Sequence, residues 1–110
     1  MSLRKARLAD LIRDILATLL SGGQMSDPAL GSVAITAVRV SADLQVATAY
    51  YRNFGSLPNK DVQAGLQRAT GYFRRQIADA IDLRRVPEVR FFFDESIERA
   101  ARVEELLAQI

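Results

Sequence analysis

The chain has 110 residues, of which 49% are hydrophobic and 25% are charged, and its formal net charge is +2. This composition is typical of one globular domain with a hydrophobic core, and it excludes an intrinsically disordered chain. Cysteine and histidine are both absent. Their absence excludes disulfides, thiolate or imidazole ligands for zinc, and the side chains that most enzymes use as nucleophile or general base. We therefore expect a protein without catalytic residues, metal or cofactor.

No stretch approaches the roughly 18 apolar residues that a membrane span requires. Arg13 and Asp14 interrupt the apolar stretch near the N-terminus, which argues against a secretory signal peptide. The lack of cysteine is compatible with a reducing compartment. We therefore expect a cytoplasmic protein that does not contact a membrane.

Basic charge is concentrated in residues 1–93. Two of the 15 basic residues are lysine, so 13 are arginine. Residues 94–110 contain five acidic residues and two arginines, which leaves 13 basic and eight acidic residues, or +5, in the rest of the chain. Genomic base composition can account for the excess of arginine over lysine, but it does not account for the clustering.

The first two predicted elements are an amphipathic helix and a strand pair. The helix has apolar residues at three- and four-residue steps and is expected to end at Gly22-Gly23; these apolar residues are Leu8, Leu11, Ile12, Ile15, Leu16, Leu19 and Leu20. Residues 32–41 and 46–54 are rich in β-branched and aromatic residues and flank the turn-forming residues 42–45. This pattern predicts two antiparallel strands.

Residues 60–82 keep an apolar stripe at helical spacing straight through Gly71, which predicts one helix or two nearly coaxial helices. Residues 88–94 then predict a third strand, in which Phe91 and Phe93 enter the core. If this strand pairs in parallel with an earlier one, the preceding helix supplies the crossover.

A final short helix is expected to begin with Ser96 as its N-cap, and Glu98 and Arg102 are spaced to pair on its surface. The order is helix, strand, strand, interrupted helix, strand and tail helix. It predicts an α+β fold in which helices cover one face of a three-stranded sheet. We expect residues 1–110 to form one domain with a tail helix in residues 95–110.

Gly71 is costly in its predicted position, because glycine is about 1 kcal/mol less favourable than alanine inside a helix. On a helical wheel, Arg68, Gly71 and Arg75 lie opposite the apolar stripe, so core packing does not explain the glycine. What remains is a kink, or the close approach of another molecule.

A kink at this position would create an anion site. A helix that restarts with Thr70 as its N-cap would expose backbone N–H groups in the following turn, next to Arg74 and Arg75. The plainer alternative is a surface ion pair between Arg75 and Asp79, four residues apart.

Residues 69–71 read Ala-Thr-Gly, and residues 83–96 read LRRVPEVRFFFDES. This series resembles the ribosome-binding factor A family, in which an Ala-x-Gly interruption of a helix precedes Leu-Arg-Arg-x-Pro-Glu-x-Arg-Phe and Asp-x-Ser. The resemblance continues at Arg7 and Ile12 and in residues 38–51, so it covers nearly the whole chain.

The resemblance implies a type II KH-like fold, in which the Ala69-Thr70-Gly71 kink replaces the Gly-x-x-Gly loop that clamps nucleic acid in other KH domains. It implies a non-catalytic bacterial assembly factor that binds the immature 30S ribosomal subunit and its 16S rRNA precursor. Such a factor assists late maturation and 5′ end processing and supports growth in the cold. We expect a monomer, with other assembly factors as further partners. Ala100 stands where family members often have glycine, so the path of residues 95–110 stays open.

The residues expected to contact rRNA are Arg39, Arg68, Thr70, Gly71, Arg74, Arg75, Arg84 and Arg85. Contact is favoured for Arg84 and Arg85, because one following acid, Glu88, cannot pair with both. Arg39 and Arg90 either contact RNA or pair with nearby acids. Phe92 either stacks on a base or lies under the tail helix, and we favour the tail helix.

Two other functions are compatible with the sequence. The first is a protein-docking adaptor that uses its acidic tail and helix faces and makes no direct RNA contact. The second is a magnesium-dependent hydrolase that uses Asp43, Asp79, Asp82 and Asp94, but these residues lack the clustered spacing of a metal site.

Overall fold

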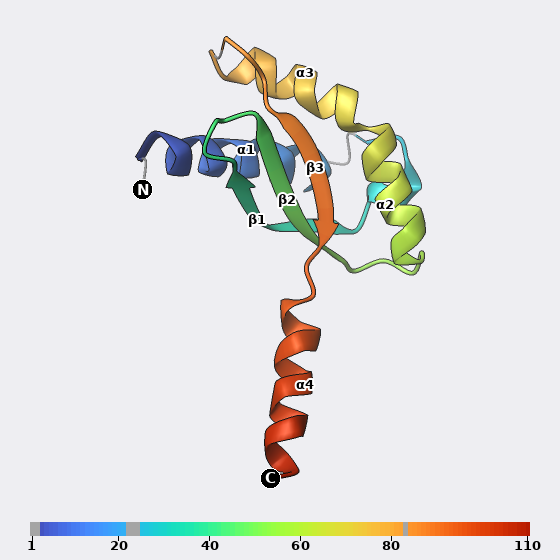
Figure 1. The fold of residues 1–110 in the computed structure, drawn as a ribbon. Helices are drawn as coiled ribbons and strands as arrows, with labels where there is room; N and C mark the ends of the chain where they lie inside the picture. The colour runs from blue at the N-terminus through green and yellow to red at the C-terminus, as the bar shows by residue number, and fades with distance from the viewer. Residues whose placement is uncertain (1–2, 22–24, 83) are drawn as a thin grey trace.

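The computed structural model describes residues 3–21, 25–82 and 84–110. Its elements, in chain order, are α1 (Leu3–Ser21), the short 3-10 helix η1 (Pro28–Leu30), β1 (Val33–Val40), β2 (Val46–Asn53), α2 (Asn59–Arg68), α3 (Thr70–Ala80), β3 (Glu88–Phe93) and α4 (Ser96–Ala108) (Figure 1). The predicted order is confirmed. The expected helix end at Gly22-Gly23 lies outside the described residues. Within the described ranges, no helix combines the length and the apolar character needed to cross a membrane.

The three strands form one mixed sheet in the order β1-β2-β3, with β1 antiparallel and β3 parallel to the central β2. Helices α2 and α3 provide the crossover that the parallel pairing requires (Figure 1). Because side chains alternate across the sheet, Ala47, Ala49 and Tyr51 of β2 all point into the core and are at most 1% exposed. The opposite face carries Arg39, Thr48, Tyr50, Arg90 and Phe92, which are partly or fully exposed.

The core lies between the buried face of the sheet and helices α1 to α3. Phe73 of α3 packs on Phe91 of β3 with 5.5 Å between ring centroids. Five of the seven apolar residues predicted for the buried stripe of α1 are buried, and Ile15 is partly buried. The prediction for Leu11 was wrong, because it is 50% exposed. At 100° per residue Leu11 points well to one side of the stripe centred on Ile12 and Leu16.

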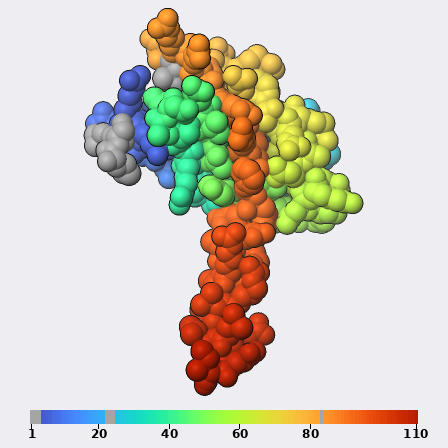
Figure 2. All heavy atoms as spheres, viewed as in Figure 1, coloured from blue at the N-terminus to red at the C-terminus, as the bar shows by residue number. Residues whose placement is uncertain are grey.

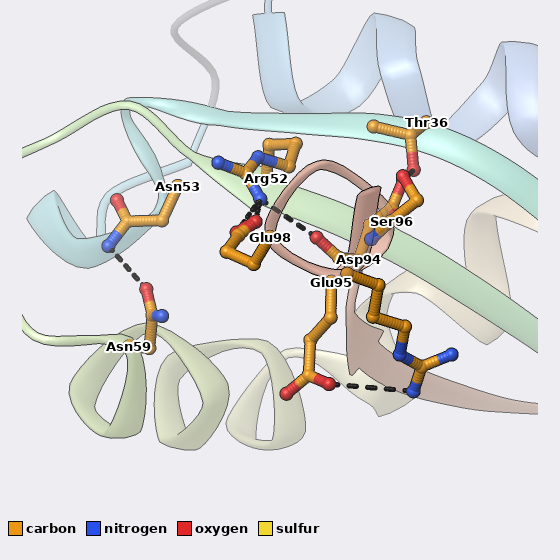
Figure 3. A network of polar contacts seen from close by, with 9 residues as sticks. Thr36, Arg52, Asn53, Asn59, Asp94, Glu95, Ser96 and Glu98 are labelled. Carbon is orange, nitrogen blue, oxygen red and sulfur yellow. Dashed lines mark hydrogen bonds and ion pairs between the residues drawn. The ribbon is translucent and has the colours of Figure 1, made fainter. Parts of the chain in front are cut away.

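Helix α4 projects away from the rest of the domain (Figures 1 and 2), and none of its side chains is buried. Its first turn is nevertheless held by polar contacts (Figure 3). The guanidinium of Arg52 donates to both carboxylate oxygens of Glu98 and, over 2.9 Å, to the carbonyl of Asp94. The carboxylate of Asp94 accepts hydrogen bonds from the Thr36 hydroxyl at 2.7 Å and from the Ser96 N–H at 2.9 Å.

These contacts correct three predictions for the tail. Ser96 is the first residue of the helix rather than its N-cap, and its N–H is capped by the side chain of Asp94 instead. Glu98 pairs with Arg52 of β2, which donates to both of its carboxylate oxygens, and no ion pair with Arg102 forms among the described residues. Phe92 does not lie under the tail helix, since α4 leaves the sheet and Phe92 stays 52% exposed.

Candidate nucleic-acid interface

The predicted break between the two crossover helices occurs at Ala69. Its backbone angles, φ −89° and ψ −2°, depart from ideal helix values, and α3 leaves the kink in a different direction from α2 (Figure 1). The expectation of nearly coaxial helices was therefore wrong. Thr70 is not the N-cap of α3, because its hydroxyl donates to the carbonyl of Gln67 at 2.8 Å. The N–H of Phe73 donates to the carbonyl of Ala69, so this group is not free for an anion.

Gly71 faces solvent in the first turn of α3, as the helical wheel predicts. A Cβ placed on Gly71 would meet only the Arg75 side chain, with 3.6 Å to Nη1, which is an ordinary van der Waals distance. Gly71 has no positive φ, so its backbone is also accessible to alanine. Neither packing nor backbone conformation in this fold requires the glycine.

The arginines around the kink differ in their partners. Arg75 makes no ion pair or hydrogen bond with any described residue, so the alternative pair with Asp79 does not form. Arg74 makes one long hydrogen bond, 3.3 Å, to the carbonyl of Val86.

Arg68 is engaged within the chain, unlike Arg75. Its guanidinium donates to Asp27 Oδ2 at 2.8 Å. This hydrogen bond, together with the one from the N–H of Ala29, lowers the pKa of Asp27 below its ordinary value of 3.8. For Arg68 to contact a phosphate, this surface pair must open, at a small cost in free energy.

A groove of about 580 Å³ runs between the kink and the edge strand β3. Its walls are polar, basic and aromatic; they are formed by Gln63, Gln67, Thr70 and Arg74 of the helices and by Glu88, Val89, Arg90, Phe91 and Phe92 of the strand. Gln63 fixes one wall to the other, because its side chain donates to the carbonyl of Phe91 at 2.8 Å and accepts from the hydroxyl of Tyr51 at 2.6 Å.

The groove includes residues that the sequence analysis missed or left open. Gln63 and Gln67 were not predicted as lining residues, and no local signal marks them, because their position depends on the pairing of β3. Arg90 pairs with Glu88 at 3.2 Å, so this arginine is internally neutralised. The Phe92 ring lies near that of Tyr50, with 6.5 Å between ring centroids, and Phe92 is 52% exposed.

The eight predicted contact residues do not form one site. Arg68, Thr70, Gly71, Arg74 and Arg75 surround the kink. Arg84 and Arg85 line a separate hollow of about 220 Å³ that also includes Arg4, and Arg39 stands on the open face of the sheet, opposite Thr48. Among the described residues, no three acidic side chains come together as a candidate metal site.

The model of the family described as "Ribosome-binding factor A" matches residues 4–107. A ribosome-binding factor A of Coxiella burnetii is 44% identical over 107 residues, which cover 97% of this chain and 89% of that protein. The chain belongs to the ribosome-binding factor A family. A ribosome-binding factor A of Methylobacterium radiotolerans is 41% identical over 108 residues, which cover 96% of this chain and 76% of that protein. Membership in the ribosome-binding factor A family confirms the prediction of a non-catalytic factor.

Solved structures of the family share this fold. A solution structure of a putative ribosome binding factor A from Thermotoga maritima has a TM-score of 0.72 and 32% identity, and covers 89% of this chain and 93% of its own. The crystal structure of ribosome-binding factor A from Thermus thermophilus has a TM-score of 0.70 and 27% identity, and the match covers 80% of this chain and 93% of the Thermus chain. A model of the Thermus factor fitted into a cryo-EM map of its complex with the 30S subunit has a TM-score of 0.69 and 26% identity. The match covers 84% of this chain and 97% of that chain.

Proposed function

We propose that this chain binds the immature 30S ribosomal subunit through its 16S rRNA precursor and assists late maturation and 5′ end processing as a non-catalytic factor. The family membership supports this proposal, as does the Thermus relative that was fitted into a map of a 30S complex. The observation that carries it is the exposed Gly71, which the fold does not require, beside Arg75, which has no partner among the described residues.

The kink is suited to an RNA backbone rather than to a small ligand. Gly71 has no side chain, so a phosphate can approach the first turn of α3 closely. Arg74 and Arg75 are exposed on that turn and can donate charge-assisted hydrogen bonds to phosphate oxygens. Arg68 can join them once its pair with Asp27 opens. The adjacent groove offers Gln67 and the ring of Phe92 to an unpaired base.

The remaining expectations belong to this proposal. Residues 1–110 would act as one KH-like unit in the cytoplasm, as a monomer without cofactor, with α4 as a tail helix. Arg39, Arg84 and Arg85 would add rRNA contacts beyond the kink, and Thr70 would border the phosphate. A contribution to growth in the cold and contacts with other assembly factors follow from the same role.

A matched pair of substitutions tests the kink. Gly71→Gln puts a long side chain where the RNA backbone would approach, whereas Ala78→Gln puts the same side chain two turns further along the exposed surface of α3. We expect Gly71→Gln to weaken binding to purified small subunits by about tenfold, equivalent to the loss of one charge-assisted hydrogen bond. Ala78→Gln should bind as the parent does. Equal binding by both variants in co-sedimentation would refute the role of the kink.

A second function, a protein-docking adaptor, is favoured by one observation. Val103, Leu106 and Leu107 of α4 are 54–63% exposed and form an apolar surface without a partner in the described chain. Binding through this surface would depend little on salt, whereas binding through phosphates weakens steeply with salt. Measuring affinity for the small subunit at two salt concentrations therefore distinguishes the two functions.

A further inference from the structure

Four exposed arginines gather at the opposite end of α3 from the kink. Arg4 and Arg7 belong to the first turns of α1, and Arg84 and Arg85 follow α3. Figure 1 shows the start of α1, the β1–β2 turn and the α3–β3 connection on the same side of the domain. We refer to these four arginines as the arginine pole.

Arg4 connects two hollows on this surface. Arg84 and Arg85 line the first, of about 220 Å³, together with Arg4 and the β1–β2 turn. Arg7 lines the second, of about 270 Å³, again together with Arg4. The arginines of the pole therefore border one continuous region, although they come from two distant parts of the sequence.

None of the four arginines makes an ion pair or hydrogen bond within the described chain. The nearby carboxylate of Asp43 is engaged elsewhere, because it accepts from the Ser41 hydroxyl at 2.7 Å and from the Gln45 N–H at 3.1 Å. By contrast Arg52, Arg68, Arg90 and Arg99 each pair with a carboxylate.

The position of Arg4 is also not explained by the stability of α1. The first turn of this helix contains no acidic residue, although a helix N-terminus favours negative side chains and disfavours positive ones. Mutual repulsion among the four arginines adds to this cost, and a polyanion from outside the chain would relieve both.

We propose that the arginine pole is a second RNA-binding site, which holds a segment of phosphate backbone different from the one at the kink. This inference rests on the proposed function. Helix α3 has 11 residues and is about 16 Å long, so the pole and the kink are separated by more than the Debye length of about 8 Å at physiological salt. An approaching RNA therefore meets two distinct basic sites, and the chain bridges two backbone segments.

The first test measures the dependence of subunit binding on salt. Two variants, Arg4→Ala/Arg7→Ala and Arg84→Ala/Arg85→Ala, each remove two charges from the pole. The control, Lys60→Ala/Arg102→Ala, removes two exposed charges from α2 and α4 instead. The loss of two phosphate contacts lowers the log–log salt slope of binding by about 1.4 to 1.8. When salt rises from 50 to 200 mM, the factor by which affinity falls should therefore be about tenfold smaller for each pole variant than for the parent.

The second test identifies what the pole touches. The chain has no cysteine, so a single introduced cysteine can carry a tethered iron chelate that cleaves nearby RNA by hydroxyl radicals. Ala42→Cys places the chelate in the β1–β2 turn beside the pole, and Gln67→Cys places it at the kink. The control, Gln109→Cys, places it at the exposed end of α4, which projects away from both (Figure 1). We expect the first two to cleave small-subunit rRNA at different nucleotides.

The outcomes separate this inference from the proposed function. Pole variants that bind like the control, or a tether at residue 42 that cleaves no rRNA, would overturn the second site while leaving the kink intact. Weaker binding without cleavage would assign the pole to an acidic protein surface and would equally overturn the RNA inference. A parent chain that does not bind small subunits at all would instead refute the proposed function.

Discussion

Gly65 in α2 and Gly71 in α3 are six residues apart, but their surroundings are opposite. A Cβ placed on Gly65 would lie 3.2 Å from Asp27 Oδ2 and 3.3 Å from Leu30 Cδ2, because α2 packs closely on η1. A Cβ on Gly71 would meet a single flexible side chain at 3.6 Å. A close approach within the chain therefore explains the first glycine, whereas no contact among the described residues explains the second. A glycine that the fold does not use is the stronger indication of an external contact.

The largest expected effect tests the conclusion that Gly65 is required for the packing of α2 on η1. Gly65→Val forces two methyl groups against η1 and should lower the free energy of unfolding by about 1 to 3 kcal/mol, the usual cost of overpacking a core. In a domain of this size that corresponds to a fall in Tm of roughly 4 to 24 °C. Thermal unfolding followed by circular dichroism measures it.

Gly71→Val is the matched control, since it makes the same substitution in open space. It should unfold within about 0.5 kcal/mol of the parent, because valine and glycine have similar helix propensities. A variant at residue 71 that is as unstable as the one at residue 65 would contradict the distinction between the two glycines.

The next prediction concerns Gly71→Ala, which separates stability from binding. The added methyl group meets no obstacle and removes the conformational freedom of glycine, so the variant should be more stable by about 1 kcal/mol. Its affinity for small subunits should nevertheless fall, because the methyl group occupies the path of the RNA backbone. Co-sedimentation and thermal unfolding on one preparation check both signs. A gain in stability with unchanged binding would mean that the RNA stays clear of this turn.

The kink could be predicted from the sequence because its signals are local. The apolar stripe runs through residues 60–82, and one residue on the opposite side of the helix is a glycine. The hydroxyl of Thr70 was misassigned as a cap, since it instead reaches back to the carbonyl of Gln67, which threonine commonly does within helices. The role of Gly65 could not be predicted, because it depends on the packing of η1, more than 30 residues earlier in the chain.

The sequence predicted which arginines could contact RNA, but it did not predict which of them lie together or which are paired with acidic residues. Arg68 and Arg75 have nearly the same position on the helical wheel. Only the structure shows that Arg68 is paired with Asp27, whereas Arg75 has no partner among the described residues. Arg84 and Arg85 were favoured as contacts because Glu88 cannot pair with both, and that argument does not say where they lie. The fold places them beside Arg4, at the far end of α3.

A smaller effect is expected when either of the two kink arginines, Arg68 or Arg75, is replaced by alanine. Arg75→Ala should leave Tm unchanged, since the side chain has no partner in the described chain, and it should reduce the log–log salt slope of subunit binding by about 0.7 to 0.9. Arg68→Ala should lower Tm by at most about 8 °C, because it removes an exposed ion pair to Asp27. If Arg75→Ala destabilised the chain as much as Arg68→Ala, the conclusion that Arg75 has no partner in the described chain would be wrong.

The smallest expected effect is a pH dependence of the stabilisation by the ion pair between Arg68 and Asp27. The hydrogen bonds from Arg68 and from the N–H of Ala29 lower the pKa of Asp27 in the folded chain below its ordinary value of 3.8. The stabilisation from a carboxylate with a lowered pKa is fully present above the unfolded value and is lost as pH falls through the folded value. The parent and Arg68→Ala should therefore differ in Tm at pH 6, and the difference should shrink as pH falls below about 3.8. Arg75→Ala provides the control, because it lacks this partner and its Tm should track the parent at every pH. A difference between parent and Arg68→Ala that stays constant down to pH 2 would show that Arg68 stabilises the chain by packing rather than by its charge.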